Sequence, residues 1–290
     1  MSTQNKPQEP ISLDLEKVLA DKSPMLSKLL PRFILNYLKK IAHQDQLNDI
    51  LKNHSHQMGI DFIDSVLAEM NTKLNIVGLE NIPTSDRCVV ASNHPLGGLD
   101  GLALMLAVSK VRMDILFPVN DILMNVKNLE PLFTPINKHG GKAHNIQVVN
   151  DTFASDSIVC YFPFGLVSRK KKGKIQDLFW RRTFIAKANK YKRDIIPTHI
   201  DGRNTNFFYN LSNIRKALGI KANLEMLFLV DELFKQENTT IKITFGKPIP
   251  YQTFDDRYTN MEWAELVRLY SYKVGEGYQE PFEVPVNHKF

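Results

Sequence analysis

A histidine and an aspartate lie close together in a short glycine-containing stretch, residues 93–100, which reads Asn-His-Pro-Leu-Gly-Gly-Leu-Asp. An imidazole titrates near neutral pH and can take a proton from an attacking group if a carboxylate orients the ring and stabilises its charge. We therefore predict that His94 is a general base oriented by Asp100. Gly97 and Gly98 would let the turn fold back on itself and bring backbone N–H groups to a developing oxyanion.

The segments on either side predict where this stretch lies. An apolar strand precedes it at residues 88–92, and a helical run begins at Gly101. A strand-to-helix turn at the carboxyl edge of a sheet is a common place for α/β folds to present reactive groups. The residue types leave a second interpretation open, in which Asp100 only caps the following helix.

A second stretch, residues 162–169, reads Phe-Pro-Phe-Gly-Leu-Val-Ser-Arg and follows another apolar strand. Together the two stretches resemble the glycerolipid acyltransferase (PlsC-like) superfamily, whose motifs are His, four residues, Asp, and Phe-Pro-Glu-Gly-Thr-Arg-Ser. Here five residues separate His94 from Asp100, and Phe164 stands in place of the Glu. The longer His–Asp spacing and the motif with Phe164 are both more similar to the branch that contains ornithine-lipid and glycine-lipid N-acyltransferases and hemolysin-like proteins. The resemblance implies an α/β fold with a mixed central sheet flanked by helices.

The resemblance also implies a set of substrate-binding residues. They are Asn93, Asn120, Phe164, Gly165, Ser168, Arg169, Asp177 and Trp180. Phe164 makes the centre of the second motif more apolar than a carboxylate would. Helix capping by Asn120 or Asp177 and a core position for Trp180 remain alternatives. His199 falls in a predicted strand, residues 195–200, and we assign it no role as a base.

Basic residues follow the second motif directly: Lys170, Lys171, Lys172 and Lys174. Such a run is either a solvated loop or a contact for the acidic surface of acyl carrier protein, the phosphates of coenzyme A or membrane phosphates. Near the N-terminus, residues 24–41 predict an amphipathic helix with cations mostly outside its apolar stripe, which Pro31 interrupts. This helix either lies in a membrane interface or packs on the core. With a second helix at residues 60–70 it would form a helical hairpin.

Composition limits the remaining possibilities. The chain has 290 residues, 43% of them hydrophobic, and a net charge of +6 that suits an anionic partner. Cys88 and Cys160 fall in apolar strands, which indicates free thiols in a reducing cytoplasm. We expect no metal, no bound cofactor and no nucleic acid, and a protein peripheral to the inner face of the cell membrane. The predicted units are a disordered tail (1–10), a helical region (11–73), the acyltransferase domain (74–250) and a C-terminal helix and tail (251–290).

The functional prediction is an acyltransferase that uses acyl carrier protein or coenzyme A thioesters without an acyl-enzyme intermediate. The favoured acceptor is an amino acid amine of the glycine or ornithine type, which would yield an N-acylated lipid. Lysophospholipid O-acylation is the nearest alternative. Two more distant ones are a thioesterase and a non-catalytic, hemolysin-like membrane protein.

Overall fold

The computed structural model describes residues 13–22, 30–120, 123–136 and 142–285. Within these residues the centre of the molecule is a seven-stranded sheet with the order β1-β9-β8-β2-β5-β3-β4. Only β8 and β9 pair antiparallel, so the sheet is mixed, as predicted. Its strands are β1 (Lys73–Val77), β2 (Cys88–Ser92), β3 (Ile115–Asn120), β4 (Phe133–Ile136), β5 (Ile158–Tyr161), β8 (Asp194–Ile200) and β9 (Thr240–Phe245).

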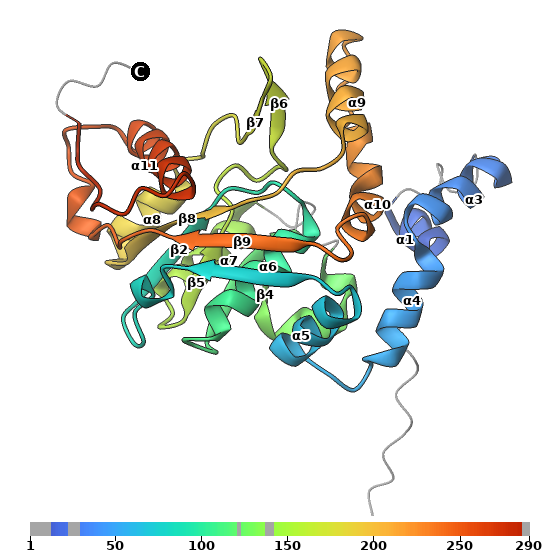
Figure 1. Cartoon of the computed structure of the whole chain (residues 1–290), viewed down its shortest axis with the longest axis horizontal. Coiled ribbons are helices and arrows are strands. Elements are labelled where there is room, and N and C mark those ends of the chain that lie inside the picture. Colours follow the sequence, from blue (N-terminus) through green and yellow to red (C-terminus); the bar gives the residue numbers. More distant parts are fainter. Residues whose placement is uncertain (1–12, 23–29, 121–122, 137–141, 286–290) are drawn as a thin grey trace, which may run out of the picture.

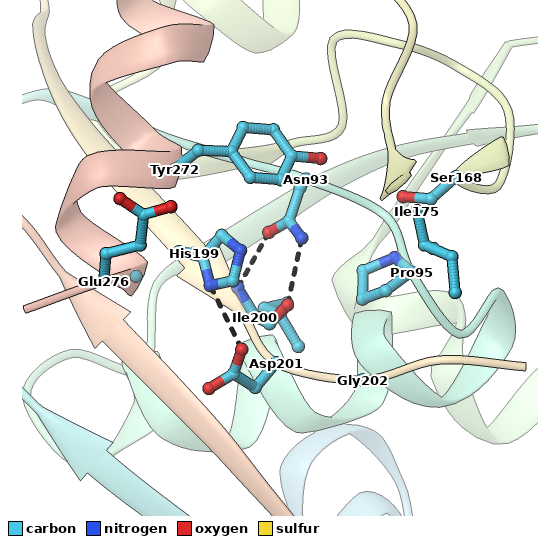
Figure 2. Close-up of a pocket in the computed structure, with 11 residues that line it drawn as sticks. Asn93, Pro95, Ser168, Ile175, His199, Ile200, Asp201, Gly202, Tyr272 and Glu276 are labelled. Carbon is cyan, nitrogen blue, oxygen red and sulfur yellow. Dashed lines mark hydrogen bonds and ion pairs between the residues drawn. The ribbon is translucent and has the colours of Figure 1, made fainter. Parts of the chain in front are cut away.

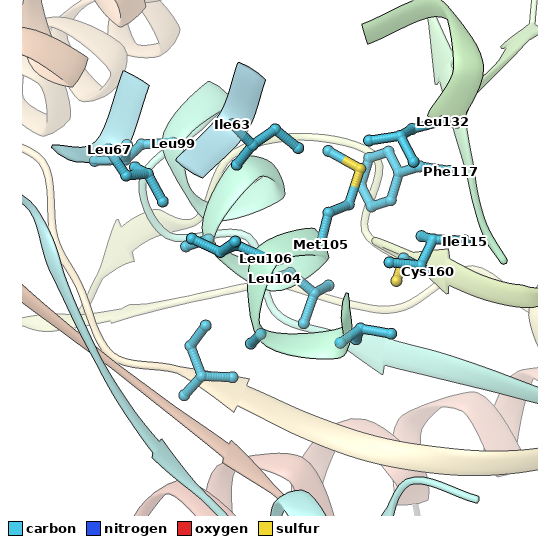
Figure 3. Packing of buried hydrophobic residues seen from close by; sticks show 14 of the residues in the cluster. Ile63, Leu67, Leu99, Leu104, Met105, Leu106, Ile115, Phe117, Leu132 and Cys160 are labelled. Carbon is cyan, nitrogen blue, oxygen red and sulfur yellow. The ribbon is translucent and has the colours of Figure 1, made fainter. Parts of the chain in front are cut away.

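The central strands are buried on both faces, and their side chains alternate between two hydrophobic cores. In β2, Cys88 and Val90 belong to one core, whereas Val89 and Ala91 belong to the other. This alternation follows from the two-residue repeat of a strand, and burial on both sides is typical of parallel sheets. Figure 3 shows the first core, where α6 packs between the sheet and the neighbouring helix α5. Both cysteines are buried free thiols.

Helices cover the two faces of the sheet (Figure 1). α5 (Gly59–Glu69) and α6 (Gly98–Ser109) contribute to the first core, and α8 (Thr183–Tyr191) and α11 (Asn260–Gly275) to the second. α7 (Lys142–Ala154) packs against β4 and α8. The described residues form five short 3-10 helices: η1 (Leu79–Asn81), η2 (Leu123–Asn125), η3 (Lys127–Leu132), η4 (Leu224–Phe228) and η5 (Tyr251–Thr253).

The N-terminal region contains α1 (Leu15–Lys22), α3 (Arg32–Ile41) and α4 (Gln44–Asn53). α3 begins directly after Pro31, whose fixed φ and missing N–H suit the start of a helix. Residues 23–29 of the expected first helix lie outside the described residues. The sequence analysis did not predict α4, which a left-handed residue, His43, separates from α3. The proposed domain boundaries stay a prediction.

Two expected segments are wrong. The basic, glycine-containing residues 134–145 predict a flexible loop, but residues 134–136 belong to β4 and residues 142–145 to α7. The helix expected to open at Asp177 begins only at Thr183, because the side chain of Asp177 is used by partners outside any helix. Before it stands an unpredicted hairpin, β6 (Arg169–Lys171) and β7 (Lys174–Gln176).

A helical segment joins β8 to β9 and was also not predicted. It comprises α9 (Asn206–Ala217), η4 (Leu224–Phe228) and α10 (Leu229–Phe234). α10 packs against α6, and the segment rises from the same side of the sheet as the β6–β7 hairpin (Figure 1). Over the described parts of the chain, no helix is both long enough and apolar enough to cross a bilayer.

Candidate active site

The site forms where β2, β5 and β8 end. β2 lies between the other two strands and is parallel to both, so all three carboxyl ends meet at one edge of the sheet. The turn that carries His94 follows β2, Phe162 follows β5, and Asp201 follows β8. Adjacent parallel strands therefore place residues from distant parts of the sequence beside one another, as is usual in α/β folds.

His94 and Asp100 meet despite the five-residue spacing. His94 Nδ1 lies 3.0 Å from Asp100 Oδ1, an ion-pair contact whose angle departs from that of an aligned hydrogen bond. The other carboxylate oxygen, Oδ2, accepts hydrogen bonds from the backbone N–H of Leu96 at 2.8 Å and of Gly97 at 3.3 Å. One oxygen of Asp100 faces the imidazole and the other caps α6, so the geometry is compatible with the orienting role, which stays a prediction, and shows the capping contact.

The extra residue in the turn is accommodated at Gly97. Its φ is +89°, a conformation that side chains rarely adopt, and a Cβ there would lie 3.1 Å from Leu229. Gly98 is the first residue of α6 and packs near Leu233 of α10. Because the Gly97 N–H already donates to Asp100, it is not free in this structure to hold an oxyanion.

The surroundings of His94 favour its charged form. Burial lowers its pKa, but the negative charge and hydrogen-bonding capacity of Asp100 outweigh burial, and the pKa is raised above its usual value. The ring of Phe162 stacks on the imidazole at a centroid distance of 4.1 Å and an angle of 22°. Phe162 lies within the second motif, yet the sequence analysis gave it no role. In the sequence, only the aromatic side chain of Phe162 could have indicated that it stacks on His94.

Three predicted residues form one buried network behind His94. Ser168 Oγ donates to Asp177 Oδ1 at 2.6 Å, and Trp180 Nε1 donates to Asp177 Oδ2 at 2.8 Å. The backbone N–H of Ser168 also donates to the carbonyl of His94 at 2.7 Å. Burial raises the pKa of Asp177, although both side-chain hydrogen bonds oppose this effect. The network ties the second motif to the turn after β2.

Arg169 lies in a buried ion cluster that the sequence analysis missed. Its Nη2 is 3.0 Å from Glu225 Oε1, and Arg215 Nε is 2.7 Å from the other oxygen of Glu225. Burial lowers the pKa of Arg169, partly offset by the charge of Glu225. In this structure the guanidinium therefore has protein partners from η4. The lysines that follow lie on the β6–β7 hairpin, where Lys171, Lys172 and Lys174 are exposed.

The other predicted substrate residues are spread around this centre. Asn93 uses both ends of its amide to hold the backbone of Ile200, at 2.9 and 2.7 Å. Phe164 is buried in the second core and contacts Phe179 edge to face. Gly165 adopts a left-handed conformation with φ +68°. Asn120 ends β3, where its backbone pairs with β4.

A pocket of about 260 Å³ opens beside the turn (Figure 2). Asn93 and Pro95, the two neighbours of His94 in the sequence, line it together with Ser168. Its opposite wall includes His199, whose ring meets that of Tyr272 at 5.2 Å and whose Nδ1 lies 3.7 Å from Asp201. Burial lowers the pKa of His199. His199 thus faces a pocket, which the apolar pattern of its strand did not indicate.

The fold is that of an α/β protein in which a histidine and an aspartate are in contact on a strand-to-helix turn. Residues 17–279 match the acyltransferase family, and the chain belongs to that family. It is 46% identical over 264 residues to the lyso-glycine lipid O-acyltransferase of Phocaeicola vulgatus, covering 90% of this chain and 95% of the relative. The enzyme of the same name from Bacteroides thetaiotaomicron is 45% identical over 264 residues, covering 90% of this chain and 97% of the relative.

A solved structure shares the fold. The 1-acyl-sn-glycerophosphate (LPA) acyltransferase PlsC from Thermotoga maritima has a TM-score of 0.50 and 14% identity, covering 92% of this chain and 97% of that one. The chain is therefore an acyltransferase with a PlsC-like fold, and an acyl donor is implied. The prediction of amine N-acylation is wrong, because both close relatives are O-acyltransferases. The two sequence motifs did not distinguish N-acylation from O-acylation.

Proposed function

We propose that this protein transfers an acyl group from an acyl thioester to a hydroxyl of a lyso-glycine lipid. The observation that carries the proposal is the pairing of His94 with Asp100 in a chain that is 46% identical, over 90% of its length, to an enzyme of that activity. A hydroxyl has to lose its proton as it attacks a thioester carbonyl, and an oriented imidazole can take that proton.

The proposed reaction needs no covalent enzyme intermediate. Nε2 of His94 takes the proton of the acceptor hydroxyl while the oxygen attacks the carbonyl carbon of the thioester. The tetrahedral intermediate then expels the thiolate, which receives the proton from the imidazolium. Asp100 keeps Nδ1 protonated and stabilises the charge that develops on the ring. Burial raises the pKa of Cys88 to about 12, which disfavours this thiol as an alternative nucleophile.

The donor in this proposal is an acyl carrier protein or coenzyme A thioester, and the site of action is an anionic membrane surface. A lipid acceptor with a long chain resides in a bilayer, so a protein with a net charge of +6 meets it more often on an anionic surface than on a neutral one. The working location in this proposal is the inner face of the cell membrane, which borders the cytoplasm that holds acyl thioesters.

The test offers the purified protein a labelled acyl thioester with lyso-glycine lipid, glycine or lysophosphatidate, followed by mild alkaline methanolysis and mass spectrometry. We expect a diacylated product from lyso-glycine lipid whose new bond is cleaved by alkali, as an ester is and an amide is not. His94→Ala is the matched control and should abolish the product. An alkali-stable product, acylation of lysophosphatidate alone, or release of free fatty acid regardless of acceptor would each overturn the proposal.

A further inference from the structure

Helix α9 exposes a stripe of large apolar side chains. Phe207, Ile214 and Leu218 are 50%, 58% and 70% exposed, and their spacings of seven and four residues place them on one face. The opposite side of the helix is used for packing, since Phe208 and Tyr209 are fully buried. The helix therefore has two apolar faces: an inward one that is buried by packing and an outward one, the stripe, that is exposed.

Neighbouring elements extend this stripe. η4 packs against α9, and Phe207 meets Phe228 edge to face at 4.9 Å. α3 packs against η4 in turn and exposes Phe33 and Tyr37, one helical turn apart. We call the following residues the apolar face: Phe33, Tyr37, Phe207, Ile214, Leu218, Leu224 and Leu227. Exposed apolar surface of this extent marks a contact with another body.

The charges around the apolar face are positive. Residues 203–224 expose three basic side chains, Arg203, Lys216 and Lys221, and contain no Asp or Glu, while their fourth cation, Arg215, is buried against Glu225. Residues 32–41 of α3 contain three basic residues and no acid, and one of the three, Lys39, pairs with Glu16 of α1. The β6–β7 hairpin packs against α9 through β6, and both rise above the sheet in Figure 1. Beyond the buried Arg169, residues 170–176 of the hairpin add four lysines and no acid. Apolar side chains surrounded by cations are the pattern that suits an anionic bilayer.

The apolar face is also connected to the catalytic turn. α10 follows η4 directly, and its Leu229 and Leu233 pack on Gly97 and Gly98. The loop between β8 and α9 supplies Asp201 and Gly202 to the pocket beside His94. A body bound to the apolar face therefore lies next to the elements that form the site.

We propose that the apolar face, with α9 at its centre, is the surface on which this protein docks to an anionic lipid bilayer. Its apolar side chains enter the region between headgroups and acyl chains, and the hairpin lysines contact lipid phosphates. The role of docking would be to bring the acyl acceptor from the bilayer to His94, and only this role rests on the proposed function. Docking itself is measured without any donor, so its failure is separate from failure of the reaction.

The test compares full-length Ile214→Glu/Leu218→Glu with wild type by flotation on vesicles. The matched control is Met113→Glu, which changes a side chain that is 64% exposed. Met113 lies just before the amino end of β3, whereas α9 follows the carboxyl end of β8, a strand of the same direction. On vesicles of phosphatidylglycerol and phosphatidylcholine, we expect the double variant to bind at least about tenfold more weakly and the control to bind like wild type. Pure phosphatidylcholine should bind all three poorly, and added salt should weaken the wild type on anionic vesicles.

Activity gives an independent readout. With acceptor embedded in anionic vesicles, the double variant should turn over more slowly by a similar factor, whereas with detergent-dispersed acceptor it should match wild type. Equal melting temperatures establish that the fold is kept. Three results would overturn the inference: unchanged vesicle binding by the double variant, equal loss of binding in the Met113→Glu control, or a dimer of wild type that the double variant converts to a monomer.

Discussion

Asp100 contacts His94 and the backbone beneath it through different oxygens of one carboxylate. Oδ1 lies 3.0 Å from His94 Nδ1, and Oδ2 accepts the Leu96 N–H at 2.8 Å. The carboxylate that faces the imidazole of His94 is thus also the group that shapes the turn carrying His94. Changes at this residue should separate the two roles, since Asn can keep the backbone hydrogen bond but carries no charge.

Asp100→Asn should lower activity by about 10²–10⁴-fold. An amide N–H facing Nδ1 would favour the tautomer with a proton on Nε2, which cannot accept another. Burial lowers the pKa of His94 and Asp100 raises it, so the variant should also titrate at lower pH than wild type. NMR titration of the His94 ring checks the second point without relying on turnover. An unchanged His94 titration would contradict the electrostatic role of Asp100.

The pH dependence of the wild-type reaction follows from the same pair. Because the base must be neutral, the rate should rise with pH through the pKa of His94, which is raised above the usual value of 6.5. Measuring kcat/KM from pH 5 to 9 should place the midpoint of this rise above pH 6.5. A midpoint below that value would show that burial, and not Asp100, dominates at the site.

Gly97→Ala should damage both stability and activity. The native φ of +89° disfavours any side chain, and the new Cβ would press on Leu229 at 3.1 Å. We expect a loss of about 1–3 kcal/mol in the free energy of unfolding, together with a fall in kcat as the turn shifts. Gly277→Ala is the control, because its φ is +99° but nothing lies within 4 Å. It should lose stability alone, as measured by urea unfolding and turnover.

Glu225→Gln should destabilise the fold by about 3 kcal/mol, since Arg169 and Arg215 would be left buried without their shared anion. Burial raises the pKa of Glu225, but the hydrogen bond from Arg215 and the charges of both arginines lower it by more. The net result is a pKa below the usual value. This carboxylate therefore adds stability above its unfolded pKa of 4.5, and that stability is lost as pH falls through the lower native value. Urea unfolding between pH 3 and 7 should show this loss in wild type and not in the variant. Glu16→Gln, at a surface pair with Lys39, should leave the midpoint unchanged.

Phe162→Leu should reduce kcat by about 10–100-fold with a smaller effect on KM. The stacked ring holds one face of the imidazole, and leucine keeps apolar volume without a flat surface. Steady-state kinetics on detergent-dispersed acceptor would measure both constants. A fall confined to KM would assign Phe162 to substrate binding.

The sequence predicted those parts of the fold that local patterns encode. The apolar run at 88–92 became β2 with the predicted bounds, and the glycine-containing turn brought His94 to Asp100. The partner of Arg169 could not be predicted, because Glu225 lies 56 residues further along the chain and carries no local pattern. α4 was missed although Leu47, Ile50 and Leu51 have helical spacing, because polar residues dominate that segment.

The acceptor was the part of the function that residue patterns left open. Hydroxyl and amine acceptors both need a base that removes a proton, so the proposed pair of His94 and Asp100 would serve either equally well. The preference depends on how the acceptor sits against residues from several strands and helices. Both close relatives are O-acyltransferases, which overturned the predicted amine acceptor.

His43, the left-handed residue between α3 and α4, contacts a helix that lies far along the chain, α10. Its Nε2 lies 2.9 Å from Asp231 of α10, and its ring stacks on Phe234 at 4.7 Å. Because α10 supports Gly97 and Gly98, the first helices brace the catalytic loop from behind. A truncated form starting at β1 would lose these contacts, and we expect the turn that carries His94 to be held less firmly in it.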